Sequence, residues 1–174
     1  MKAKPIFCLL LLSFQLNAQT LPCENAGTEF MSKLIGSWSV QAKERTSPGN
    51  YESNQGESVI SWGIQGCSLQ ETYSGTYKGH GYAVKYETYL KDSLSVQRSF
   101  FDSEHHNLML FEGSIERDSM INFWYRNPEK KRMQVKNELV ILSAQSFKNT
   151  THLSTDYGQT WQLTHEWVYS KTQR

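Results

Sequence analysis

The sequence lacks the motifs and the charge imbalance that mark many enzymes and nucleic-acid-binding proteins. It contains no glycine-rich phosphate loop, no G-x-S-x-G nucleophile motif and no H-E-x-x-H zinc motif. Its 18 basic and 17 acidic residues nearly balance, so we expect no basic surface for nucleic acid or an anionic membrane. Repeats, low-complexity tracts and linkers are also missing, which indicates a single domain.

Long apolar runs are missing except at the N-terminus. There, two lysines precede an apolar stretch over residues 6–14, and Ala18 is a small residue at the expected cleavage point. The stretch has about half of the ~20 residues that cross a membrane, so residues 1–18 are predicted to be a cleaved secretory signal. Loss of the two lysines changes the formal net charge from +1 to −1. We expect residues 19–174 to be one exported domain, periplasmic or secreted, without a membrane-spanning segment.

Cysteine is scarce, since the chain has three and Cys8 falls within the predicted signal. Cys23 and Cys67 remain, and an oxidising compartment favours a disulfide between them over two unbonded thiols. No C-x-x-C pair occurs, so neither a zinc site nor a cysteine nucleophile is indicated. The stretch 102–106 contains two acids and two histidines, and we interpret it as a solvated hairpin turn because neighbouring strand side chains point apart. We expect no metal and no cofactor.

Helical periodicity is nearly absent as well. Residues 24–34 are the one segment with apolar residues at helical spacing. From Trp38 onward, apolar and polar residues alternate with a period of two, and turn residues recur about every ten residues, which is typical of antiparallel β-structure. Nine or ten such strands predict an all-β protein, as a closed antiparallel barrel rather than a sandwich, because closure removes exposed edges.

Aromatic residues are abundant on the faces that are predicted to point inward. They indicate either a packed core or a partly open cavity that holds one small ligand. Two polar residues interrupt these faces, Arg98 and His165, and a buried arginine needs either a partner or an anionic ligand. The predicted ligand-binding residues are Trp62, Tyr82, Tyr86, Arg98, Trp124 and His165.

These residues favour a barrel that binds a small, largely apolar or aromatic molecule. Two alternatives remain open at this point. One is a barrel enzyme in which His165 and a carboxylate such as Glu112 act as acid and base. The other is an interaction module of the cell envelope that acts through its surface. No residue is assigned as catalytic, and the oligomeric state is left open.

Gly36-Ser37-Trp38, directly after the predicted helix, resembles the G-x-W signature of lipocalins and their calycin relatives. The resemblance implies that Trp38 closes the barrel floor beneath a basic side chain of a late strand, either Lys171 or Arg174. Thr155-Asp156-Tyr157 matches the lipocalin T-D-Y motif by letter, but the chain that follows is long enough for one strand only.

Residues 154–161, STDYGQTW, resemble the Asp-box of sialidases and other propellers. The resemblance implies a structural hairpin in which Asp156 accepts backbone hydrogen bonds, Gly158 takes a positive φ and Trp161 begins the last inward-facing row. One box in a chain of this length excludes a sialidase propeller. The predicted structural residues are Gly36, Trp38, Asp156, Gly158 and Trp161.

Residues 28–170 as a whole resemble a bacterial family of lipocalin-like domains of unknown function. The segments that carry this resemblance read LIGSW, ETYSGTYKGHGYAVKYETY and DYGQTW…EWVYSK. The resemblance implies a calycin-type β-barrel, and it supplies an expected fold without an activity.

Overall fold

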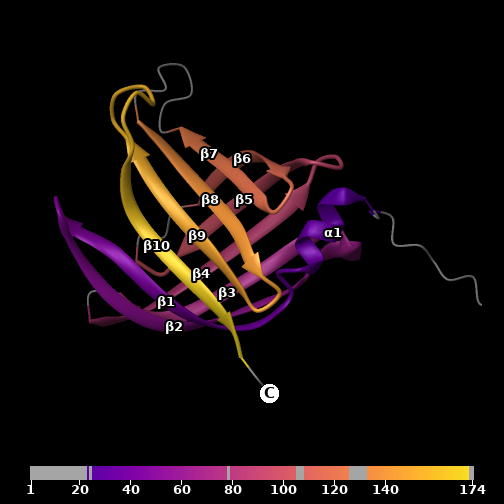
Figure 1. The fold of residues 1–174 in the computed structure, drawn as a ribbon, viewed down its shortest axis with the longest axis horizontal. Coiled ribbons are helices and arrows are strands. Elements are labelled where there is room, and N and C mark those ends of the chain that lie inside the picture. Colours follow the sequence, from indigo (N-terminus) through magenta and orange to yellow (C-terminus); the bar gives the residue numbers. More distant parts are fainter. Residues whose placement is uncertain (1–22, 24, 78, 105–107, 126–132, 173–174) are drawn as a thin grey trace, which may run out of the picture.

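The protein is a closed antiparallel barrel of ten strands, preceded by one short helix (Figure 1). This computed structural model describes residues 23, 25–77, 79–104, 108–125 and 133–172. The elements are α1 Ala26–Ser32, β1 Gly36–Ser47, β2 Asn50–Trp62, the 3-10 turn η1 Ile64–Gly66, β3 Ser68–Tyr77, β4 His80–Leu90, β5 Ser95–Asp102, β6 Met109–Glu116, β7 Ser119–Tyr125, β8 Gln134–Ser143, β9 Ser146–Ser154 and β10 Gln162–Lys171. The predicted fold class is confirmed.

Each strand pairs with its neighbour in the chain, and β1 closes the barrel by pairing with β10. Hairpin connections therefore alternate between the two ends of the barrel. We call the end that carries α1 and the β4–β5, β6–β7 and β8–β9 turns the floor, and the opposite end the mouth (Figure 1). No helix in the described ranges is long and apolar enough to cross a membrane.

The floor is built around Trp38, which is 1% exposed. Its Nε1 donates a hydrogen bond to the backbone oxygen of Leu34 over 2.9 Å, and the Phe147 ring packs against it in a T-shaped arrangement at 4.8 Å between centroids. Lys171 Nζ lies 5.0 Å from the centre of the Trp38 ring. Lys171 thus occupies the place that the lipocalin resemblance implies, whereas Arg174 lies outside the described residues.

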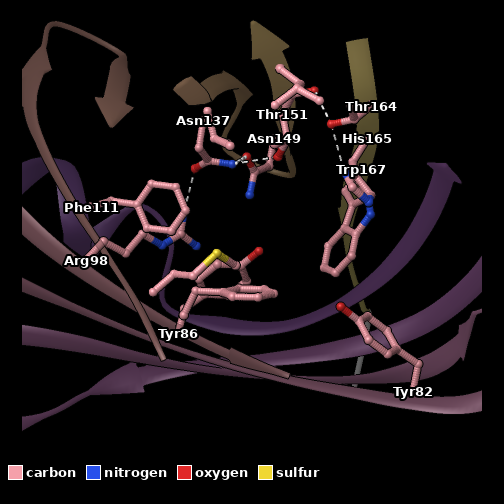
Figure 2. Close-up of a pocket in the computed structure, with 14 residues that line it drawn as sticks. Tyr82, Tyr86, Arg98, Phe111, Asn137, Asn149, Thr151, Thr164, His165 and Trp167 are labelled. Atoms are coloured by element: carbon pink, nitrogen blue, oxygen red, sulfur yellow. Dashed lines mark hydrogen bonds between the residues drawn. The ribbon is translucent and has the colours of Figure 1, made fainter. Parts of the chain in front are cut away.

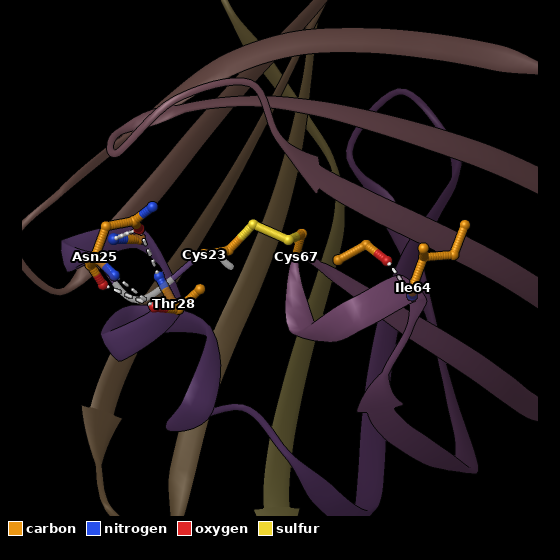
Figure 3. Close-up of a disulfide and its surroundings, with 7 residues drawn as sticks. Cys23, Asn25, Thr28, Ile64 and Cys67 are labelled. Carbon is orange, nitrogen blue, oxygen red and sulfur yellow. Dashed lines mark hydrogen bonds between the residues drawn. A yellow bond between two sulfur atoms is a disulfide. The ribbon is translucent and has the colours of Figure 1, made fainter. Parts of the chain in front are cut away.

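A disulfide between Cys23 and Cys67 ties the segment before α1 to the connection between β2 and β3 (Figure 3). The predicted disulfide is present, with the two Cα atoms 5.4 Å apart. The helix begins immediately after it, because Asn25 Oδ1 accepts hydrogen bonds from the backbone nitrogens of Gly27 and Thr28. The predicted signal, residues 1–18, lies outside the described residues.

The turn over residues 154–161 has the hydrogen bonds of a structural hairpin. Asp156 Oδ1 accepts from the backbone nitrogen of Thr160 at 2.9 Å, and Oδ2 accepts from the Thr160 hydroxyl at 2.6 Å. These bonds lower the pKa of Asp156 to about 2. Gly158 adopts a φ of 81° and its nitrogen donates to Ser154 Oγ at 2.9 Å. The carboxylate and the glycine therefore shape the backbone here.

A β-bulge near the start of β10 overturns one expectation about Trp161. His165 pairs with Thr151 but Leu163 pairs with His152, so Thr164 is an extra residue in the ladder. One extra residue reverses the alternation of faces. Trp161 therefore packs on the outer face, with its ring 6.3 Å from that of Phe123, and does not begin the inward row.

Candidate functional site

The barrel interior contains a cavity of about 260 Å³ on the mouth side. Its lining residues come from β4, β5, β6, β8, β9 and β10; they are Tyr82, Tyr86, Arg98, Phe100, Met109, Phe111, Val135, Asn137, Asn149, Thr151, Leu153, Thr164, His165 and Trp167 (Figure 2). A second space of about 10 Å³ lies on the floor side, among Leu34, Ile60 and neighbouring apolar residues. Arg98 borders both spaces. Arg98 and the polar side chains bonded to it therefore form a layer that separates the cavity from the floor.

That layer is centred on a buried ion pair. Arg98 Nη2 donates to Glu71 Oε2 at 3.0 Å, and the two side chains are 3% and 6% exposed. The other carboxylate oxygen, Glu71 Oε1, accepts from Ser58 Oγ at 3.0 Å and from the Tyr169 hydroxyl at 2.8 Å. The Arg98 guanidinium also lies 3.8 Å from the centre of the Tyr86 ring. Of the two possibilities that a buried arginine allows, the structure shows the internal partner.

Two asparagines extend this polar layer up one wall of the cavity. Arg98 Nη1 donates to Asn137 Oδ1 at 2.8 Å, and Asn137 Nδ2 donates to Asn149 Oδ1 at 2.6 Å. Asn137 Nδ2 also donates to Thr151 Oγ1 at 3.1 Å. Figure 2 shows Asn137 and Asn149 side by side, with the amide nitrogen of Asn149 pointing into the cavity.

The remaining walls are aromatic or aliphatic. Tyr82, Tyr86, Phe111 and Trp167 surround the space drawn in Figure 2. Burial raises the pKa of both tyrosines, so their hydroxyl groups stay neutral. Trp167 is 5% exposed, and its Nε1 has no hydrogen-bond partner in the part of the chain that the structure describes. The cavity therefore combines flat apolar surfaces with a few polar groups.

His165 is held by the bulge residue beside it. The Thr164 hydroxyl donates to the backbone oxygen of Thr151 at 2.9 Å, and His165 Nδ1 lies 3.0 Å from the same hydroxyl oxygen. Because the hydroxyl proton is already directed at Thr151, His165 Nδ1 must carry the hydrogen of the second bond.

The acid–base pair of the enzyme alternative is not brought together. Glu112 lies on the outer face of β6, with its side chain 70% exposed and bonded to Lys91 Nζ at 3.4 Å. The wall of the barrel therefore separates Glu112 from His165. The inward-facing carboxylate that lies opposite His165 in the β1–β10 register is Glu44, which the sequence did not single out.

Four of the six predicted ligand-binding residues line the cavity: Tyr82, Tyr86, Arg98 and His165. Trp62 is the last residue of β2, at the floor end, where the chain leaves the sheet and the side chain is 37% exposed. Trp124 lies in β7, which contributes no residue to the cavity lining.

Sequence reasoning missed Asn137 and Asn149. A weak signal for both was available, since each interrupts a row of alternating apolar residues, Asn137 between Val135 and Leu139, and Asn149 after Phe147. Among the described residues there is no cluster of three or more histidine, cysteine, aspartate or glutamate side chains that could hold a metal ion.

No family model and no curated protein matches the sequence at a significant level. Solved structures match the fold: the chain is similar to Rv2717c from M. tuberculosis, with a TM-score of 0.61 and 12% identity, over 84% of this chain and 98% of that one. It is also similar to the S-type phycobiliprotein lyase CPES from Guillardia theta, with a TM-score of 0.59 and 9% identity, over 87% and 95% of the two chains. These likenesses, together with the closed barrel, fit a calycin or lipocalin-like fold.

Proposed function

We propose that the protein is an exported barrel that binds one small, largely apolar or aromatic molecule in its interior. The observation that carries this proposal is the cavity of about 260 Å³ above the Arg98–Glu71 layer. Its volume is close to the lower end of the range of roughly 300–1,000 Å³ that is typical of small-molecule sites. Its apolar walls with a few convergent polar groups are also typical of such sites.

The export part of the proposal is supported by the disulfide. Disulfides persist in oxidising compartments and are rare in reducing ones. The Cys23–Cys67 disulfide is therefore a bond that we expect to form in an exported protein. One solved relative in fold is named a phycobiliprotein lyase, but an identity of 9% supports only the shared architecture.

Native mass spectrometry of protein purified from its own host tests the proposal. We expect an added mass from a small organic molecule, which is lost when the protein is denatured. The same protein, stripped of that molecule, is then tested for a rise in melting temperature with a library of aromatic and lipid compounds.

Two adjacent positions on β6 provide a matched pair of variants. Met109 lines the cavity, whereas Leu110 points outward and is 52% exposed. Met109→Trp should fill the cavity and abolish the bound mass and the melting shifts, and Leu110→Trp should preserve both. Equal binding by the two variants, or no bound compound in the unmodified protein, would overturn the proposal.

A further inference from the structure

We infer that the cavity selects a neutral aromatic molecule that presents a hydrogen-bond acceptor, such as an aryl ketone, to the wall formed by Asn149 and Thr151. The inference rests on the proposed function, since it specifies which molecule the same cavity takes. It follows from the direction in which the hydrogen bonds run across the polar layer.

The direction of this hydrogen-bond chain is fixed at its buried end. An arginine has only donors, so the Asn137 side chain must turn its oxygen toward Arg98 Nη1. The amide nitrogen of Asn137 then faces Asn149, so the side-chain oxygen of Asn149 must accept the hydrogen bond. Asn149 is left with its amide nitrogen on the cavity side, where Figure 2 shows it. The ion pair with Glu71 holds Arg98 in place, and it therefore fixes the orientation of the whole series of hydrogen bonds.

The neighbouring Thr151 hydroxyl is oriented in the same way. Thr151 Oγ1 accepts the second bond from Asn137 Nδ2 at 3.1 Å, so its proton remains to be donated. Asn149 is 4% exposed, and its amide nitrogen has no partner among the described residues. Trp167 also lines the cavity, and its buried Nε1 has no hydrogen-bond partner in the described chain. Asn149 and Thr151 thus each leave a donor on this wall, and an acceptor on the ligand would satisfy them.

The charge around the cavity disfavours an anion as that acceptor. The positive charge of Arg98 is already paired with Glu71 inside the barrel. Two more carboxylates, Glu44 and Asp102, are buried at 2% exposure each. Burial is the main cause that raises the pKa of the Tyr82 hydroxyl, and the negative field of these two carboxylates raises it further. A neutral carbonyl oxygen satisfies the donors without opposing this field.

Three compounds of nearly the same shape separate the possibilities. Acetophenone carries a ketone, α-methylstyrene replaces the carbonyl oxygen with a methylene group, and benzoate replaces the ketone with a carboxylate. Dissociation constants are measured by calorimetry on the full chain and on Asn149→Leu, which removes the donor at similar volume. We expect the ratio of the α-methylstyrene constant to the acetophenone constant to fall by about tenfold in the variant, the usual effect of one buried hydrogen bond. Benzoate should bind the unmodified protein at least about tenfold more weakly than acetophenone.

A measurement on the unmodified protein keeps the inference testable if Asn149→Leu does not fold. Acetophenone, but not α-methylstyrene, should move the side-chain amide resonances of Asn149 in ¹⁵N-labelled protein, because only the ketone accepts their hydrogen bond. An unchanged ratio in a folded variant, equal shifts with the two neutral compounds, or preferred binding of benzoate would overturn the inference. Failure of the proposed function would give a different result. In that case no aromatic compound would bind inside the barrel, so Met109→Trp would abolish no binding.

Discussion

At the scale of single residues, Arg98 contacts several other side chains of the interior. It pairs with Glu71, stacks on Tyr86 and orients Asn137, all within a layer that separates the cavity from the floor. A buried ion pair gives little net stability relative to apolar residues of the same volume, but removing one member leaves an uncompensated charge. The pair is therefore better understood as a device that fixes the geometry of the cavity wall.

Arg98→Met should lower the free energy of unfolding by about 3–5 kcal/mol, because it leaves the Glu71 carboxylate buried without its counter-ion. Chemical denaturation measures this change. Lys91→Met is the matched control: its partner Glu112 is exposed, so the loss should stay below about 1 kcal/mol. The double variant Arg98→Met, Glu71→Gln should recover part of the stability. Similar losses for Arg98→Met and Lys91→Met would contradict a buried pair.

The sequence predicted that Arg98 faces inward, because it stands between Val96 and Phe100 in an alternating row. It did not predict Glu71, which lies 27 positions away and reaches Arg98 only through the pairing of strands around the barrel. Trp62 shows a second limit of prediction from the alternation of residues. It follows the alternation correctly, but its strand ends at that residue, so the pattern no longer reports which way the side chain points.

At the scale of elements, strand glycines and the bulge in β10 shape the sheet. Tyr73 is fully buried and lies over Gly56 and Gly75, which are paired across β2 and β3. A side chain at either glycine would collide with the tyrosine ring. The bulge at Thr164 is equally local, and it places both Thr164 and His165 on the cavity lining. The alternation of apolar and polar residues could not predict this bulge, because one inserted residue does not change the composition of the segment noticeably.

Gly75→Ala should destabilise the protein by about 1–3 kcal/mol, the usual cost of overpacking. Its Cβ would meet the Tyr73 hydroxyl and lie 2.8 Å from the backbone oxygen of Gln55. Gly81→Ala, on the neighbouring strand β4, is the control because its Cβ would have nothing within 4 Å. We expect it to leave stability unchanged or to raise it by up to about 1 kcal/mol. Denaturation midpoints that are equal for the two variants would contradict this packing.

Asp156→Ala should lower the melting temperature by about 2–4 °C near neutral pH, as the loss of a capping side chain does. It should leave the binding of aromatic compounds unchanged, since Asp156 does not line the cavity. The pKa of Asp156 is about 2, below the ordinary value of 3.8, so its contribution is complete above pH 3.8 and disappears as the pH falls through 2. Melting curves across that interval should show the difference between the two proteins vanish. A stable variant that no longer binds would contradict the structural assignment.

At the scale of the whole molecule, the alternation of apolar residues and the spacing of turns predicted antiparallel β-structure, and the absence of exposed edges favoured a closed barrel over a sandwich. Most strands hide one face, and a closed sheet lets them do so without leaving an edge. The hollow was harder to predict. Whether inward aromatic rings fill a barrel or only line it depends on their packing in three dimensions. The alternation of residues in the sequence does not determine that packing.

The disulfide is the one covalent constraint on this fold in the described residues. It closes a segment with a sequence separation of 44, and the chain-entropy model assigns about 4 kcal/mol to a loop of that length. Adding a reductant should therefore lower the free energy of unfolding by up to this amount. Cys67→Ser should show the lower stability already and should not respond to the reductant. A response in the variant as large as that of the parent would contradict the bond.

The barrel is proposed to be hollow and to take a small aromatic molecule into its interior. Crystals grown with iodobenzene test it most directly, because the anomalous signal of iodine locates the molecule without ambiguity. We expect one strong iodine peak inside the barrel, between Phe111 and Trp167 and above the layer formed by Arg98 and Glu71. An interior filled by side chains, with iodine found only on the outer surface, would contradict it.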